Sequence, residues 1–267
     1  MALGWAYTPE DWRFSADTAM AFVVEEDGVV IGTAMCWKFG ADRASIGHLI
    51  VSPAHQGRGL GRGLMELLLQ EVSSRITFLH ATPAGRPLYE KLGFVVCGSL
   101  EQYQGTVGET LPMALPDGEK LRIATPEDFP FLIEMDARAS RLERPALLSA
   151  LLRRGQGLVL ERDGRIIGFS VLRPFGWGYV IGPVIAPGSP DDRYARTLIG
   201  YWLASRQGEF VRVDIPVGTT LTDWLPRQGL KLVDVCAKMV RNASADASGG
   251  PSDPAYRLYA LISQAML

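Results

Sequence analysis

The sequence predicts a mixed α/β protein with layers of the α+β type, built from two tandem copies of one fold. Two observations support this prediction. Short apolar segments alternate with segments whose apolar residues recur at three- and four-residue spacing, which is the pattern of strands followed by helices. In addition, one series of landmarks occurs twice, in the same order, along the 267 residues. A series repeated in this way is typical of a duplicated fold.

The two series begin with similar segments, FVVEEDGVVIGTAM (22–35) and LVLERDGRIIGFSV (158–171). In each, an apolar strand leads into Asp-Gly, at Asp27-Gly28 and Asp163-Gly164, and a second strand returns through Ile-Gly. Asp and Gly tolerate the positive φ angles of a two-residue turn, so each segment predicts a tight β-hairpin. Later landmarks also match: Ile50-Val51 with Val184-Ile185, Pro53 with Pro187, and Leu92-Gly93-Phe94 with Gln228-Gly229-Leu230.

The remaining elements follow the same order in both copies. A third strand (45–51 and 178–185) precedes an amphipathic helix, and a fourth strand (76–81 and 210–216) precedes a shorter helix and a last strand. Each copy therefore predicts a mostly antiparallel, twisted sheet flanked by helices. The apolar faces of the amphipathic helices are expected to consist of Leu60, Leu64, Leu67 and Leu68 in the first copy, and of Leu198, Trp202 and Leu203 in the second.

The copies differ at their front ends. Residues 121–157 leave room for a strand and two helices before the second hairpin, whereas the first copy lacks its opening strand and part of its first helix. Either the chain starts late, or the apolar residues 255–267 cover the open sheet edge. The expected boundaries are a first domain at 1–104, a Gly- and Pro-rich linker at 105–119, a second domain at 120–242, a flexible segment at 243–254 and a docked C-terminal tail at 255–267.

Composition excludes several classes of function. A net charge of −2 gives no global basic field, so no nucleic-acid partner is expected. No apolar run reaches membrane-spanning length and no leader follows Met1, so we expect a cytoplasmic protein without a membrane partner. Cys36, Cys97 and Cys236 form no CxxC pair and are expected to be reduced thiols. The three histidines show no metal-ligand spacing, so no metal is expected.

The glycine-rich stretch HQGRGLGRGL (55–64) lies between the third strand and the first amphipathic helix. It contains no Gly-Lys pair, which excludes a nucleotide-triphosphate P-loop, and neither Gly57 nor Gly59 starts a GxGxxG dinucleotide pattern. A third phosphate-loop pattern, Gln/Arg-x-x-Gly-x-Gly/Ala, fits in two registers. Its longer form, with a leading Val-x-Pro and a closing Leu, selects one register, which uses Val51, Pro53, Gln56, Gly59, Gly61 and Leu64.

This stretch resembles motif A of the GNAT superfamily of acyl-CoA N-acyltransferases. The segment LYEKLGF (88–94) resembles the second landmark of that superfamily, and the two landmarks have the expected order and separation. The resemblance covers residues 20–103, and the whole chain resembles bacterial tandem-GNAT proteins whose second copy is degenerate. It implies two GNAT-like domains, acetyl-CoA as cosubstrate, and direct attack of a primary amine in a ternary complex.

The physical chemistry of the loop agrees with this resemblance. The loop opens a helix, so its first N–H groups have no intrahelical partner, and the helix dipole favours an anion there. Glycines let this backbone approach a pyrophosphate without a Cβ in the way. The other interpretation is a glycine-rich turn that serves only helix packing. The resemblance implies cofactor contacts from the strand backbone at Leu49, Ile50 and Val51, and from Gln56, Gly57, Arg58, Gly59, Leu60, Gly61 and Arg62 of the loop.

The resemblance also implies Tyr89 as the general acid for the leaving thiolate, with a packed structural tyrosine as the alternative. The base is less well defined, because the third-strand positions at which members often carry Glu or His are Gly47 and Ser45 here. His48 is the catalytic candidate, although it is one residue out of phase and needs a β-bulge to face the same side. A structural histidine, with the proton leaving through water, is the other interpretation, and His80 has similar standing.

The second copy lacks the loop. It carries Asp191 and Asp192 at the equivalent helix start, where they are expected to cap the helix and to repel a pyrophosphate. Leu225 occupies the position equivalent to Tyr89. The second domain is therefore expected to bind no CoA, and either to shape the acceptor pocket or to support the first domain. The aromatic residues expected in a cleft or in its core are Trp177, Tyr179, Tyr201 and Trp224.

Together these features predict an N-acetyltransferase that acts on a small-molecule or peptide amine, as a monomer or a homodimer. A non-catalytic CoA-binding sensor or a GNAT-like scaffold is the alternative, because the third strand offers no clear base. No charged run marks the acceptor, so the sequence leaves its identity open.

Overall fold

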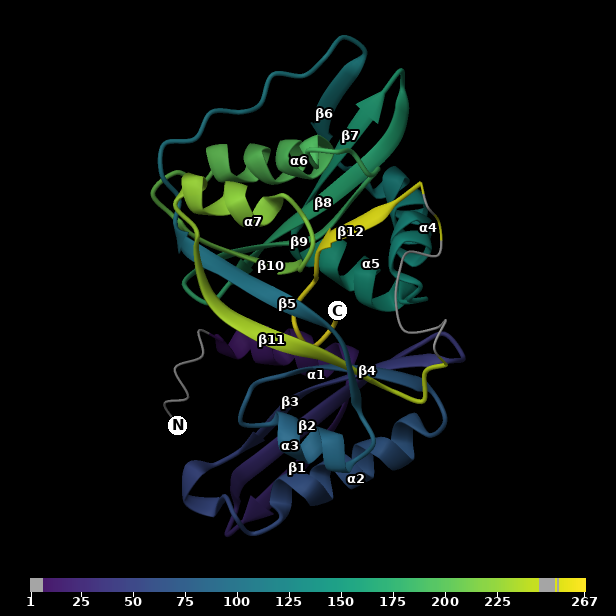
Figure 1. Cartoon of the computed structure of the whole chain (residues 1–267), viewed down its shortest axis with the longest axis vertical. Helices are drawn as coiled ribbons and strands as arrows, with labels where there is room; N and C mark the ends of the chain where they lie inside the picture. Colours follow the sequence, from purple (N-terminus) through teal and green to yellow (C-terminus); the bar gives the residue numbers. More distant parts are fainter. Residues whose placement is uncertain (1–6, 245–252, 254) are drawn as a thin grey trace. The chain divides into compact units, whose positions relative to one another are not determined.

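The computed structural model describes residues 7–244, 253 and 255–267, and it has the predicted mixed α/β architecture (Figure 1). The chain divides into two compact units. The first consists of the described residues within 1–98, 236–249 and 264–267, and the second of those within 99–235 and 250–263. The segment expected to be flexible, 243–254, lies almost entirely outside the described residues.

The first unit has a sheet with the strand order β1-β2-β3-β4-β11. Its neighbouring strands are antiparallel except β3 and β4, which pair in parallel. The elements of this unit are α1 (Pro9–Thr18), β1 (Met20–Glu26), β2 (Val29–Phe39), β3 (Arg43–Val51), the 3-10 helix η1 (Pro53–His55), α2 (Leu60–Val72), β4 (Ile76–Ala81), α3 (Arg86–Lys91) and the end of β11 (Lys231–Arg241).

The second unit has a sheet with the order β5-β10-β9-β8-β7-β6, and a further strand, β12, pairs with β9 outside this path. Strands β9 and β10 pair in parallel, and the other neighbours are antiparallel. The elements are β5 (Val95–Thr106, whose first residues belong to the first unit), β6 (Glu119–Ile123), η2 (Pro126–Asp128), α4 (Phe129–Ser140), α5 (Pro145–Arg154), β7 (Gln156–Arg162), β8 (Arg165–Phe175), β9 (Gly178–Ala186), α6 (Arg193–Ala204), β10 (Phe210–Pro216), α7 (Leu221–Trp224), η3 (Leu225–Gln228) and β12 (Arg257–Ala260).

The last strand of each copy pairs in the unit of the other copy. In the first unit, residues 237–241 of β11 pair antiparallel with residues 77–81 of β4. In the second unit, residues 100–106 of β5 pair antiparallel with residues 210–216 of β10. The sequence repeat identifies equivalent strands but does not say which copy supplies the last strand of each sheet. The expected domain boundaries, 1–104 and 120–242, therefore place each last strand with its own copy, whereas it pairs in the unit of the other copy.

Both predicted hairpins form, with two-residue turns. Strands β1 and β2 are joined by Asp27-Gly28, and β7 and β8 by Asp163-Gly164. The φ angles are 50° and 76° in the first turn and 50° and 74° in the second. Two successive positive φ angles define a type I′ turn, which Asp-Gly supports without strain. The predicted tight hairpins are thus confirmed.

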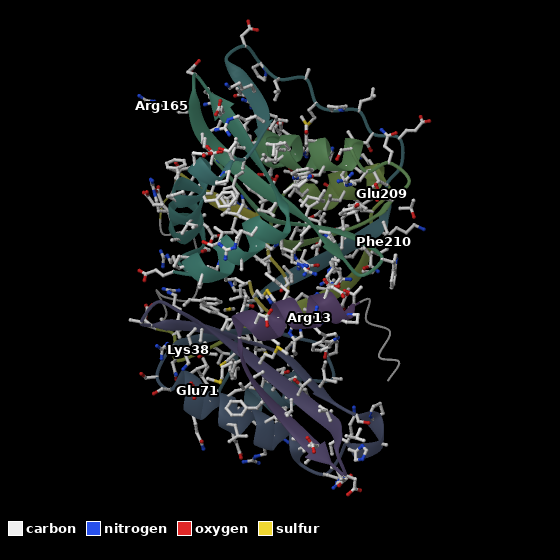
Figure 2. The ribbon with its side chains drawn as sticks, turned by 180° about the vertical axis from the view of Figure 1, so that it is seen from behind. Arg13, Lys38, Glu71, Arg165, Glu209 and Phe210 are labelled. Carbon is white, nitrogen blue, oxygen red and sulfur yellow. The ribbon has the colours of Figure 1, made fainter. Side chains whose placement is uncertain are left out.

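Helix α2 packs one face on the sheet of the first unit. The prediction that Leu67 belongs to this face is wrong, because Leu67 is 44% exposed and Met65 is buried instead. The buried positions make one stripe along the helix, and position 67 lies beside that stripe. Lys38 of β2 and Glu71 of α2 form an ion pair at the margin of this contact (Figure 2). The buried residues of α2 are Leu64, Met65, Leu68 and Val72.

Strand β12 lies where two strands of the second unit diverge. Strands β9 and β10 pair only through residues 179–181 and 211–213. Further along β9, residues 184–186 pair with β12 instead, and the N–H of Leu261 donates to the C=O of Asp214 in β10 over 2.9 Å. The segment thereby satisfies backbone groups that the divergence leaves unpaired. The expectation that this segment covers the open edge of the first copy does not hold, because β12 pairs with β9.

Within the described residues, the first unit has no counterpart of β6, so β1 is its edge strand. The second unit has this strand, and β6 pairs with β7 there. No helix in the described ranges is long and apolar enough to cross a membrane.

Candidate active site

Strands β3 and β4 of the first unit diverge after a short parallel pairing. Residues 43–45 pair with residues 76–78, and no strand of the described chain pairs with the later part of β3 on that side. The other edge of β3 is held by β2 as far as Val51, which pairs with Gly32. The backbone at Leu49, Ile50 and Val51 therefore lies on an open strand edge, which is where the contact with a pantetheine arm is expected.

A β-bulge changes the direction of His48. In the pairing of β2 with β3, both His48 and Leu49 lie opposite the single residue Ala34. His48 has a positive φ of 52°, which histidine adopts more readily than most residues. Strand alternation alone would turn His48 away from Gly47, but the bulge brings both to the ring of Trp37. That ring lies 3.5 Å from a Cβ built on Gly47, and its centroid is 5.7 Å from that of His48.

Three aromatic rings surround the imidazole of His48. The ring centroids of Tyr7, Trp12 and Trp37 lie 5.3, 5.1 and 5.7 Å from its own. Trp12 is held in place by α1, which starts with a capping box at Thr8. His48 is only 5% exposed, and among the described residues neither of its ring nitrogens has a hydrogen-bond partner. Burial lowers the pKa of His48 to about 4, so the imidazole is neutral near pH 7 and keeps a free lone pair.

The glycine loop ends in the first turn of α2. Gly57 and Gly59 have left-handed φ angles of 78° and 79°, which glycine adopts without strain. The first helical hydrogen bond runs from the N–H of Gly63 to the C=O of Gly59 over 3.0 Å. Among the described residues, no acceptor is bonded to the three preceding N–H groups, those of Leu60, Gly61 and Arg62. These three donors lie at the positive end of the helix dipole, which favours an anion.

The polar side chains of the loop are held by protein groups. The Nε2 of Gln56 donates to the C=O of Val51 over 3.1 Å and fixes the exit from β3. Arg58 pairs with Glu26 over 2.8 Å, and Arg62 pairs with a glutamate one turn along α2, also over 2.8 Å. Both pairs are exposed, and such pairs contribute little stability. A phosphate can therefore compete for both guanidinium groups.

Tyr89 lies on α3, and its ring packs against the start of that helix. A Cβ built on Gly85 would lie 3.1 Å from a ring carbon of Tyr89 and 3.5 Å from its hydroxyl oxygen. Phe94 makes an edge contact with the ring, with centroids 6.2 Å apart. The hydroxyl has no hydrogen-bond partner among the described residues. Burial raises the pKa of Tyr89 to about 12, so the phenol stays protonated at neutral pH.

The sequence does not predict that residues 264–267 lie on the face of the first unit's sheet that carries His48. The C=O of Ala265 accepts a hydrogen bond from Ser45 Oγ over 2.8 Å, and the C=O of Gln264 lies 2.7 Å from His80 Nδ1. This segment thus engages Ser45, which stands at a position where family members often carry a base, and His80, a further histidine that was considered. The apolar composition of 255–267 predicts that the segment docks, but it carries no signal for the partner.

The second unit holds a carboxylate where the first has free helical N–H groups. Asp192 precedes α6, is 3% exposed, and accepts from Thr220 N–H over 2.7 Å and from Thr220 Oγ1 over 3.0 Å. The N–H of Arg193 is capped instead by Ser189 Oγ at 2.9 Å and Asp191 Oδ1 at 3.3 Å. The predicted cap by Asp192 is therefore wrong, because its side chain turns to Thr220. A buried carboxylate at this helix start disfavours a second anion.

The other second-copy positions divide between core and surface. Leu225, the counterpart of Tyr89, is completely buried. Trp177 is 71% exposed and contacts Phe210. The remaining aromatic residues of this set pack against the core of the second unit, as the core interpretation predicts; they are Tyr179, Tyr201 and Trp224.

The three cysteines, Cys36, Cys97 and Cys236, form no disulfide. Burial raises the pKa of Cys36 to about 11, so this thiol is protonated and unreactive at neutral pH. In the part of the chain that the structure describes, no group of three or more His, Cys, Asp or Glu side chains is placed to hold a metal ion.

Two family models match the chain. The model described as "Acetyltransferase (GNAT) family" matches residues 3–94, and the model described as "Acetyltransferase (GNAT) domain" matches residues 132–249. A relative from Bacillus subtilis (strain 168), the uncharacterized N-acetyltransferase YitH, is 31% identical over 226 residues, which are 83% of this chain and 76% of the relative.

Solved structures share the fold over most of the chain. A putative acetyltransferase from Pyrococcus horikoshii has a TM-score of 0.75 and 21% identity, covering 96% of this chain and 83% of its own. A tandem GNAT protein from the clavulanic acid biosynthesis pathway has a TM-score of 0.62 and 17% identity, covering 90% and 86%. The fold and the matches together define a tandem acyltransferase. The chain belongs to the GNAT family of N-acetyltransferases, which confirms the predicted resemblance and the predicted pair of GNAT domains.

Proposed function

We propose that the first unit transfers an acetyl group from acetyl-CoA to a primary amine, which attacks the thioester directly in a ternary complex. One observation supports this proposal most strongly. The open edge of β3 is followed in the chain by the start of α2, whose first N–H groups have no partner among the described residues. The helix start offers donors to a pyrophosphate, and the strand edge offers backbone partners to an extended pantetheine arm. Both parts of one CoA molecule thus find complementary groups in a single unit.

The reaction makes one bond and breaks one. The amine nitrogen bonds to the thioester carbon, the C–S bond breaks, the amine loses one proton, and the departing thiolate gains one. A backbone N–H on the open edge of β3 would polarise the thioester carbonyl. Because the amine attacks directly, no covalent enzyme intermediate and no nucleophilic side chain are needed.

His48 and Tyr89 are proposed for the two proton transfers. His48 is neutral above a pH of about 4, so its lone pair is available to the N–H of the attacking amine. This low pKa makes it a weak base, so it would act on the tetrahedral intermediate, and the amine has to arrive already neutral. Tyr89, with a pKa of about 12, remains protonated and supplies the proton to the thiolate.

The second unit would support the first unit rather than bind a second CoA, because Asp192 and β12 occupy the equivalent places. The acceptor is proposed to be a small-molecule or peptide amine, without participation of nucleic acid. Three cysteines without a disulfide fit the reducing cytoplasm that we propose as the location.

Release of the free CoA thiol from acetyl-CoA, measured over a panel of primary amines that includes amino acids, tests the reaction. We expect a CoA-dependent rise in Tm and amine-dependent release of thiol. A rise in Tm without release for any amine would contradict the catalytic proposal and favour a CoA-binding sensor. Absence of any CoA-dependent shift would overturn both.

A further inference from the structure

Residues 264–267 lie on the face of the first unit's sheet that carries His48. Ala265, Met266 and Leu267 are 7%, 2% and 5% exposed, so the segment is packed into the unit. It lies beyond the second matched family domain, which ends at residue 249. The chemistry proposed above makes no use of it.

The segment bridges β3 and β4 where these strands begin to diverge. Their parallel pairing ends at Ser45 and Phe78. There, Ser45 Oγ donates to the C=O of Ala265 over 2.8 Å, and His80 Nδ1 lies 2.7 Å from the C=O of Gln264. These two contacts fasten one stretch of backbone to both diverging strands, at the start of the open edge proposed for the pantetheine arm.

Ala265 meets β3 at Gly47. A Cβ built on Gly47 would lie 2.4 Å from the Cβ of Ala265 and 2.9 Å from its Cα, which is inside van der Waals contact. Residue 47 is therefore confined to glycine by Ala265. The next residue is His48, whose buried ring nitrogens have no hydrogen-bond partner in the part of the chain that the structure describes.

We propose that residues 264–267 form a wall of the acceptor site in the first unit and that Ala265 limits the size of the amine. This proposal rests on the acetyl transfer proposed above. Helix α2 packs on one face of β3, so the amine has to approach the thioester from the other face, where His48 can receive its proton. Ala265 and Trp37 flank this approach, because both lie against Gly47.

The wall also indicates the kind of amine. Residues 264–267 carry no charged side chain, and the rings beside His48 are those of Tyr7, Trp12 and Trp37. These side chains give no counter-ion to a second charge on the acceptor, and burial of an unpaired charge is costly. The acceptor class is therefore a primary amine with a short, uncharged substituent.

Ala265→Gly removes the methyl group that meets Gly47, and Ala260→Gly is the matched control, an alanine of β12 in the core of the second unit. Thiol release from acetyl-CoA is compared for the full chain and both variants with n-propylamine, n-hexylamine and benzylamine, and without amine. Ala265→Gly is expected to raise kcat/KM for the two larger amines relative to n-propylamine about tenfold, the discrimination typical of one methyl group in a pocket. Hydrolysis without amine should also rise, because water uses the same approach, whereas Ala260→Gly should change neither.

Gly47→Ala is the opposite change, because its Cβ pushes the segment away from β3. It is expected to raise KM for n-propylamine about tenfold while the Kd for CoA stays unchanged. If Ala265→Gly binds CoA but changes neither the ratio of kcat/KM between the larger amines and n-propylamine nor the rate of hydrolysis, residues 264–267 do not form a wall of the acceptor site. The proposed acetyl transfer would be unaffected by that result. Absence of CoA binding by the unaltered chain would instead overturn the proposed function itself.

Discussion

Arg58 donates two hydrogen bonds to the carboxylate of Glu26, over 2.8 and 3.3 Å, beside the glycine loop. The Nε2 of His55 lies 3.1 Å from the same carboxylate. The hydrogen bond from Arg58, and to a lesser degree His55, holds the pKa of Glu26 below its usual value. Glu26 is thus more than a solvated hairpin residue, because it places a negative charge where the pyrophosphate is proposed to bind. A bound phosphate has to displace it from Arg58.

Glu26→Gln is expected to tighten CoA binding roughly two- to fivefold, because the amide keeps the shape but competes less for Arg58. The gain should shrink at high salt, which screens exposed charges. Calorimetric titration with CoA at two salt concentrations measures both effects, and Glu25→Gln, an exposed neighbour on β1, is the control. Weaker binding by Glu26→Gln alone would show that Glu26 helps to build the site.

The double change Gly59→Glu with Gly61→Glu is expected to abolish the CoA-dependent rise in Tm. Two carboxylates at the start of α2 repel a pyrophosphate, and residue 59 also loses the unstrained φ of 79° that glycine provides. Gly63→Glu is the control, because the N–H of Gly63 is already bonded to Gly59 and, apart from its chain neighbours and the backbone of α2, no described atom lies within 4 Å of a Cβ there. This control should keep most of the shift. A shift retained in the double variant would refute the loop assignment.

Tyr89→Phe is expected to lower kcat about 100-fold with an unchanged Kd for CoA, because it removes the proposed proton donor and keeps the ring. Since the pKa is about 12, the unaltered chain should show no loss of kcat from Tyr89 at moderately alkaline pH. Tyr103→Phe, which removes a buried hydroxyl from β5, is the matched control and should leave kcat unchanged. Equal losses in both variants would point to stability instead of proton donation.

Local patterns predict the hairpins and the main helices well, because these depend on residues close together in the sequence. Asp27-Gly28 turns the chain through its own φ angles, and the apolar spacing of α2 predicts two of its four buried residues, Leu64 and Leu68. The pairing of β11 with β4 and of β5 with β10 joins distant segments. The two last strands are equivalent in the repeat, so the residue pattern of each strand does not indicate which of the two sheets it joins.

The candidate site likewise has parts that depend on neighbouring residues and parts that depend on distant segments. The loop from Gln56 to Gly61 is contiguous, so residue spacing predicts both its place and its unpaired N–H groups. The direction of His48 depends on a bulge that arises from the register of β2 against β3, which leaves no mark in the sequence of β3 alone. The contact of Ala265 with Gly47 exists only through the path of a distant segment.

His48→Asn tests the buried imidazole through the pH dependence of stability. The pKa of His48 falls from 6.5 to about 4 on folding, so its stabilising contribution is fully present above pH 6.5 and is lost as the pH falls through 4. The loss amounts to roughly 3 kcal/mol. Asn accepts a positive φ and gains no charge, so the Tm of the variant should fall less between pH 7 and pH 4. Its packing cost is the same at both pH values, and an equal fall in Tm would contradict a neutral, buried His48.

CoA is expected to bind once per chain. Among the described residues, free helical N–H groups follow an open strand edge in the first unit, whereas in the second unit Asp192 occupies the helix start and β12 the strand edge. Calorimetric titration should therefore give a stoichiometry near one, and Gly59→Glu with Gly61→Glu should leave no residual site. Asp192→Asn removes a charge, but β12 still fills the divergence of β9 and β10, so no second site should appear. A stoichiometry near two, or binding that survives in the double variant, would show that the second unit accepts CoA despite β12.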